Sequence, residues 1–205
     1  MNELSYFSVE GAYGGNQDWH TNLVMHMGGC AALVACDSLI YFAKDLARAD
    51  LYPFDLEQVT KEDYKAFGML MKPYISPRIH GVKKLAWYKE GLEQYLTDYG
   101  ITFPYRIKEF SGDNELSLAK ERVRRQIDGG KVVPFLLLKH QQKSLSFFTW
   151  HWFLLTGYEE EESGEMRVTV ATYAKKHTIS FDQLWDTGYE EKGGMILYEE
   201  REGKV

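Results

Sequence analysis

The stretch GGCAALVACDSLIYFAKDLARA, residues 28–49, carries the strongest structural signal in the chain. Its apolar residues include positions 30, 33, 34, 40, 41 and 42, and helix breakers are few, which predicts a largely buried helix. Gly28 and Gly29 allow the backbone to turn tightly where this helix begins. Cys30 is therefore expected at a helix start, where backbone N–H groups and the helix dipole stabilise a thiolate.

Three more helices are expected after this one, and two of them have a recognisable end. Thr60 is predicted to cap the second helix, with Asp63 three residues further on. Gly100 is the expected residue beyond the end of the third helix. The expected helices lie between residues 60 and 73, at 82–99 and at 115–129, whereas residues 1–27 are expected to be irregular and 101–110 to form a short extended piece.

Beyond Gly130 the sequence pattern is that of β-strands. The predicted strands are KVVPFLLLKH (131–140), SFFTWHWFLLTGYEE (146–160), GEMRVTVATYAKK (164–176) and GGMILYEE (193–200), and HTISFDQLWDTGY (177–189) passes from a strand into a short helix. Helices followed by antiparallel strands predict an α+β fold. We expect a single domain over 1–205, with a helical part at about 28–130 packed on an antiparallel sheet at about 131–205.

Composition and charge exclude several classes of function. The formal net charge is -6 and no basic run exceeds two residues, so no nucleic-acid partner is expected. No apolar stretch approaches the roughly 20 residues of a membrane-spanning helix, and no signal peptide is visible, so no membrane partner is expected. The two cysteines, Cys30 and Cys36, lie on different faces of one helix and cannot pair. Together these features predict a cytoplasmic protein, and they leave its oligomeric state open.

Cys30 has two interpretations from its position alone, a nucleophile or a small buried side chain, and they carry about equal weight. Cys36 is expected to be inert core. The base that would serve a nucleophile is best sought at His151, which lies among aromatic and aliphatic residues of a predicted central strand. A metal site at His20, His26 and Cys30 matches no common zinc spacing, and neither a metal nor a cofactor is expected. The other histidines, His80, His140 and His177, have polar surroundings and are predicted to lie at the surface.

Two segments resemble the papain-like cysteine peptidase superfamily. One is Gly-Cys-Ala opening an apolar helix at Cys30. The other is His-Trp, three apolar residues and Thr-Gly-Tyr from His151 to Tyr158, preceded by Gly-Lys-Val-Val-Pro. This order is similar to that of the bacterial double-glycine leader peptidases, the bacteriocin-processing type, and their stand-alone relatives. The resemblance covers Gly14–Ala43 and Ile127–Trp185, and residues 50–110 match nothing in that family.

The resemblance implies a role for each of three residues. Cys30 would be the nucleophile, and His151 the general base that later protonates the leaving group. Gln17 would donate a hydrogen bond to the oxyanion, with Asn22 as a weaker alternative. The resemblance thus implies a thiol hydrolase, a peptidase or amidase, that acts on a peptide or small-molecule substrate through a thioester.

The residue that should orient the histidine departs from the family pattern. The family places Asn or Asp at the end of the strand after the histidine strand, and here that position falls on Thr172 or Ala171. A hydroxyl stabilises an imidazolium less than a carboxylate does. Three interpretations follow: a weakened dyad, an orienting group from elsewhere (Asp18 or Asp182), or an inactive relative that binds a peptide or small ligand in the same cleft.

Overall fold

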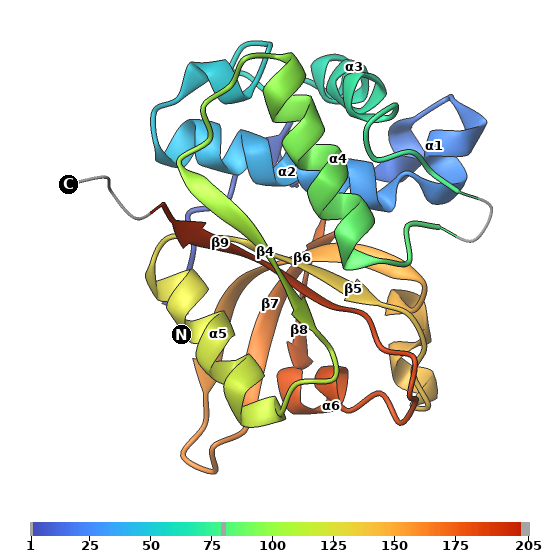
Figure 1. Cartoon of the computed structure of the whole chain (residues 1–205), viewed down its shortest axis with the longest axis vertical. Helices are drawn as coiled ribbons and strands as arrows, with labels where there is room; N and C mark the ends of the chain where they lie inside the picture. The colour runs from blue at the N-terminus through green and yellow to red at the C-terminus, as the bar shows by residue number, and fades with distance from the viewer. Residues whose placement is uncertain (1, 79–80, 202–205) are drawn as a thin grey trace.

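The computed structural model describes residues 2–78 and 81–201. The predicted α+β class is confirmed: helices lie on both faces of a seven-stranded sheet in which every pairing is antiparallel (Figure 1). The helices are α1 (Leu23–Gly28), α2 (Cys30–Asp45), α3 (Lys61–Met71), α4 (Leu85–Asp98), α5 (Leu116–Asp128) and α6 (Phe181–Trp185), with short 3-10 turns at η1 (Gln17–Trp19), η2 (Ala49–Leu51) and η3 (Lys143–Phe148).

The sheet has the strand order β4-β9-β5-β6-β7-β8, and β1 also pairs with β6. Its strands are β1 (Asn2–Glu3), β4 (Tyr105–Ser111), β5 (Val133–Leu137), β6 (His151–Glu160), β7 (Met166–Thr172), β8 (Lys175–Ser180) and β9 (Gly194–Glu200), and a separate hairpin is formed by β2 (Ser8–Val9) and β3 (Ala12–Tyr13). The strand that begins at His151 is central, between β5 and β7, as its apolar sequence predicts.

The predicted central helix is α2, in which every residue from Cys30 to Ala43 is buried. It packs in one core with α3, α4 and one face of the sheet, while α5 and α6 pack in a second core on the opposite face (Figure 1). Being enclosed on all sides explains why α2 carries apolar residues around its whole circumference. Its N-terminus lies against the beginning of β6, where the backbone of Trp152 contacts the thiol of Cys30.

The predicted helix ends are also confirmed. The Thr60 hydroxyl accepts a hydrogen bond from the Asp63 N–H at 3.1 Å, which caps α3. Gly100 adopts a φ of 66° beyond α4, and its N–H donates to the carbonyl of Thr97. The Ile101 N–H reaches back to the carbonyl of Leu96, which completes the Schellman arrangement that favours glycine at this position.

Five parts of the chain differ from expectation. The strand predicted at 146–160 begins only at His151, after the 3-10 turn η3, and the strand predicted at 164–176 is interrupted by the turn at Tyr173 and Ala174 and continues as β8. Residues 1–27 are not irregular throughout but contain β1, the β2–β3 hairpin and α1. The extended piece at 101–110 includes β4, a strand that pairs with β9 along its whole length, so the sheet is not confined to residues after 131. Helix α5 lies across the sheet from the other long helices. Two-residue strands show no period, and a helix's apolar stripe does not indicate which sheet face it covers.

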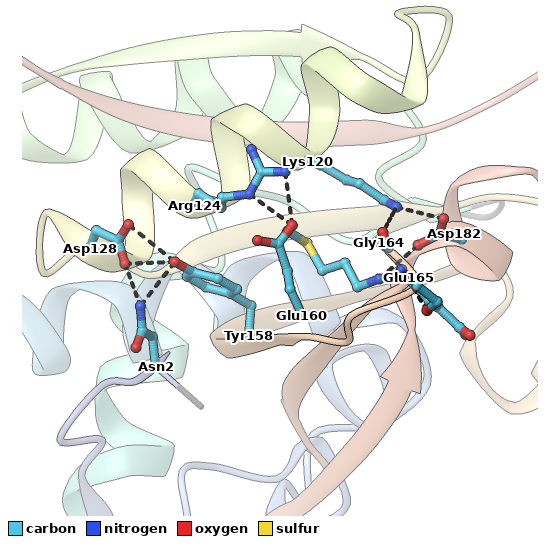
Figure 2. A network of polar contacts seen from close by, with 11 residues as sticks. Asn2, Lys120, Arg124, Asp128, Tyr158, Glu160, Gly164, Glu165 and Asp182 are labelled. Carbon is cyan, nitrogen blue, oxygen red and sulfur yellow. Dashed lines mark hydrogen bonds and ion pairs between the residues drawn. The ribbon is translucent and has the colours of Figure 1, made fainter.

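A network of polar contacts fastens α5 to the sheet (Figure 2). Tyr158 donates to the carboxylate of Asp128 at 2.9 Å, and Arg124 pairs with Glu160. At the other end of the helix, Lys120 Nζ lies 2.6 Å from Asp182 Oδ1. Asp182 is thus engaged with α5.

Within the part of the chain that the structure describes, we find no helix with the length and apolar character needed to span a bilayer.

Candidate active site

The N-terminus of α2 meets the beginning of β6 and the end of β7 at one small cavity. Cys30, His151, Gln17 and Thr172, which are far apart in the sequence, all line it. The first three also line an adjoining cleft of about 830 Å³ that is open to solvent. The structure therefore brings together all four residues that the sequence singled out.

Cys30 is held at the helix start by a sharp junction between α1 and α2. Gly29 ends one helix and precedes the other, and a Cβ at Gly29 would lie 2.5 Å from the carbonyl oxygen of Met25. Cys30 is only 9% exposed, and burial raises the pKa of its thiol. The backbone N–H groups of Trp152, Ala31 and Cys30 itself act in the opposite direction but do not cancel this rise in pKa. The helix start favours a thiolate, but burial outweighs this effect and the pKa of the thiol lies above its ordinary value.

His151 is oriented by Thr172. Its Nε2 atom lies 2.7 Å from Thr172 Oγ1, and its ring stacks on Tyr173 with centroids 4.8 Å apart and planes 13° from parallel. His151 is 6% exposed, and burial alone lowers its pKa to about 4. No charged group contributes to that shift, and among the described residues neither Asp18 nor Asp182, the two alternatives from the sequence, forms a hydrogen bond with this ring.

The second ring nitrogen of His151, Nδ1, is the one left for Cys30. Among the described residues it makes no hydrogen bond, and none joins the ring to the thiol of Cys30. The structure thus contains a neutral imidazole and a neutral thiol facing the same cavity.

Gln17 lies at the cleft, with one part of its amide already engaged. Its Nε2 donates to the carbonyl of His26 at 3.0 Å, and its Oε1 is buried without a hydrogen-bond partner in the described residues. One N–H of the amide therefore remains for a ligand. The alternative donor, Asn22, is used as the cap of α1, where it accepts from the Met25 N–H, and it does not line the cleft.

Tyr173 is a site residue that the sequence did not single out as a partner of His151. Tyr173 and Ala174 form the two-residue turn between β7 and β8, with φ values of 49° and 58°. Such turns favour Asn-Gly, because both positions need positive φ. Trp150, directly before His151, has a φ of 53°. Bulky residues in this region are strained, and strain of this kind concentrates at functional sites.

Asp37 is a second residue that the sequence did not reveal. It lies on α2 about two turns after Cys30 and lines the same small cavity. Its carboxylate accepts hydrogen bonds from the hydroxyls of Tyr6 and Tyr64, at 2.8 and 2.7 Å, and from the N–H of Gly15. Burial raises its pKa to about 6. An acidic residue in the middle of an otherwise apolar stretch of helix was the only signal.

The remaining histidines do not gather into a site. In the described part of the chain, His20, His26 and Cys30 do not form a metal-binding cluster. His20 is buried beside Tyr64, and burial lowers its pKa to about 4. His140 contacts the Gln183 carbonyl near the surface, whereas His177 is half-buried against Phe147 and Phe148, and His80 lies outside the described residues.

Comparison of the chain with protein families, curated proteins and solved structures finds no match. The chemistry of the site is therefore argued from its own geometry. That geometry consists of a thiol at a helix start, an imidazole oriented through Nε2, and an amide N–H, all facing one cleft.

Proposed function

We propose that this protein is a thiol hydrolase, a peptidase or amidase with a papain-like site, in which Cys30 forms a thioester with the acyl part of its substrate. The observation that carries the proposal is the convergence of Cys30 and His151 on one cavity, with Thr172 holding the far nitrogen of the ring. A nucleophile, a base and a group that orients the base are the parts that such catalysis needs.

The protonation states determine the order of events. Because the thiol of Cys30 and the ring of His151 are both neutral, Nδ1 takes the thiol proton as the sulfur attacks the substrate carbonyl. In this reaction the backbone N–H groups at the start of α2 and the amide of Gln17, which lines the same cleft, would donate hydrogen bonds to the oxyanion. The imidazolium then gives its proton to the leaving amine, and water activated by His151 hydrolyses the thioester.

Acylation by a p-nitrophenyl ester of an N-acetylated apolar amino acid tests the proposal. We expect a stoichiometric burst of nitrophenolate and an acyl group located on Cys30 by mass spectrometry. The burst should disappear in Cys30→Ser and fall strongly in His151→Gln, whereas Cys36→Ala, which removes the other buried thiol, should leave it unchanged. A burst that is indifferent to His151→Gln would contradict a role for that base.

A second candidate function is ligand binding without turnover at the same cleft. It is favoured by the absence of a carboxylate or amide at Thr172 and of a hydrogen bond between the described atoms of Cys30 and His151. The same acylation experiment separates the two functions. A ligand that protects Cys30 from alkylation but is recovered intact, with no acylation of the thiol, would support binding alone.

A further inference from the structure

Exposed apolar side chains gather at the candidate cleft. Val24 and Met27 of α1 line one part of it, and Phe147 and Trp150 line another. All four are large and strongly exposed, with Met27 at 74%. Exposed apolar groups clustered at a cleft mark a binding surface. Since Cys30 and His151 lie in the same cleft, an apolar group bound there would be close to the reacting bond.

Another part of the cleft is positively charged, although the chain as a whole has a net charge of -6. Arg78 and Lys83 line it together with a single carboxylate, Glu191. Glu191 is paired with Lys139 at 2.9 Å, and the charges of Lys139 and, to a smaller extent, Lys83 lower the pKa of its carboxyl. Among the described residues, neither Arg78 nor Lys83 forms an ion pair with a carboxylate.

Arg78 is also held in a defined orientation. Its guanidinium lies over the ring of Trp87, with its central carbon 4.0 Å from the ring centroid. A guanidinium over an aromatic ring can still present N–H groups to a ligand, and the fork geometry of these groups matches the two oxygens of a carboxylate. An oriented arginine without an acidic partner in the described structure therefore points to an anionic ligand.

We propose that the substrate is a peptide with a bulky apolar side chain near Cys30 and a carboxylate that Arg78 binds, with Lys83 in support. This inference rests on the proposed function for the position of the scissile bond. The carboxylate is either the free C-terminus of a short peptide or an acidic side chain, and both present the same two oxygens to the guanidinium.

Binding to the full-length Cys30→Ala protein at low salt tests the proposal without requiring turnover. The probes are N-acetyl-Leu-Phe-Ala with a free carboxylate, the same peptide as its amide, and N-acetyl-Leu-Phe-Glu amide, measured by calorimetry or NMR titration. At least one carboxylate peptide should bind about tenfold more tightly than the uncharged amide. Tighter binding of the first peptide would identify the carboxylate as a free C-terminus, and tighter binding of the third would identify it as an acidic side chain. A Ser-Gly-Ala peptide with a free carboxylate should bind more weakly than its Leu-Phe-Ala counterpart.

Variants connect this preference to the arginine. Arg78→Gln in the same background should bind the acid and the amide almost equally, whereas Arg125→Gln, which removes an exposed arginine on α5, should keep the difference. Equal binding of acid and amide by the parent protein, a difference that survives Arg78→Gln, or no binding of any peptide would overturn the proposal. If Cys30 is nevertheless acylated in a His151-dependent way, the proposed function stands and only the substrate class fails.

Discussion

Thr172 makes the only hydrogen bond to the His151 ring in the described structure, and it is a neutral one. We predict that Thr172→Val slows acylation of Cys30 by about tenfold or less, because a neutral hydrogen bond contributes roughly 1 kcal/mol. Loss of an orienting aspartate in a serine-protease triad costs about 10⁴ in rate, so the two kinds of partner are distinguishable. The measurement is the burst rate with the nitrophenyl ester. Thr169→Val, a substitution of another buried threonine on β7, is the control and should change little.

The pH dependence of alkylation reports the charge state of the pair. The pKa of the Cys30 thiol is raised and that of His151 is lowered to about 4, so we predict no thiolate–imidazolium pair in the unliganded protein. Only the thiolate reacts with iodoacetamide. In Cys36→Ala, the rate should therefore rise about tenfold per pH unit from pH 6 to 9. A plateau between pH 5 and 8 would contradict this expectation and indicate a preformed ion pair.

At the scale of elements, the β7–β8 turn places the Tyr173 ring on His151 at a conformational cost. Ala174 has a φ of 58°, and a residue with a Cβ is disfavoured in this region by about 1 kcal/mol or more. We predict that Ala174→Gly raises the free energy of unfolding by up to about 1 kcal/mol. Ala66→Gly is the matched control on an exposed position of α3 and should lower the free energy of unfolding by about the same amount. Denaturant titration measures the change in the free energy of unfolding for both variants. If the two changes have the same sign, the result is inconsistent with strain in the turn.

The elements that were predictable from the sequence are those with long, uninterrupted patterns. Helix α2 carries a long, mostly apolar run and β6 contains a continuous apolar stretch after His151, so their type and their central positions follow from local residues. Strand β4 alternates imperfectly at a sheet edge, and β1 contains only two residues, so tertiary pairing defines them. The same distinction applies to the candidate site. Sequence motifs predicted Cys30 and His151, whereas the stacking of Tyr173 on His151 depends on the β7–β8 turn, which brings the two rings together.

At the scale of the whole molecule, the Asp37 network joins the N-terminal segment to the helical layer. Tyr6, Gly15 and Tyr64 come from three parts of the chain and all donate to one carboxylate on α2. A Cβ on Gly15 would lie 1.8 Å from the ring of Tyr64, so this contact requires glycine. The carbonyl of Gly15 also accepts from the N–H of Ala174, which connects the network to the β7–β8 turn beside His151.

Asp37 should make the stability of the whole fold depend on pH. Its pKa is raised from 3.8 to about 6, so between these values the folded chain holds a proton that the unfolded chain has released. The stability that this proton provides is complete below about pH 4 and is lost as the pH rises through 6, a change of about 3 kcal/mol by pH 7.

Asp37→Asn carries no such proton, and its free energy of unfolding relative to wild type should therefore increase by about 3 kcal/mol between pH 4 and pH 7. Using the difference between the two proteins removes the contributions of groups that titrate alike in both, His20 and His151 included. Tyr64→Phe removes one donor to the carboxylate and should move the midpoint of this change to higher pH. Urea titrations at a series of pH values provide the measurement. A difference between Asn variant and wild type that stays constant from pH 4 to 7 would show that Asp37 is ionised throughout, and the network would then be a fixed anchor for the N-terminal segment instead of a titrating one.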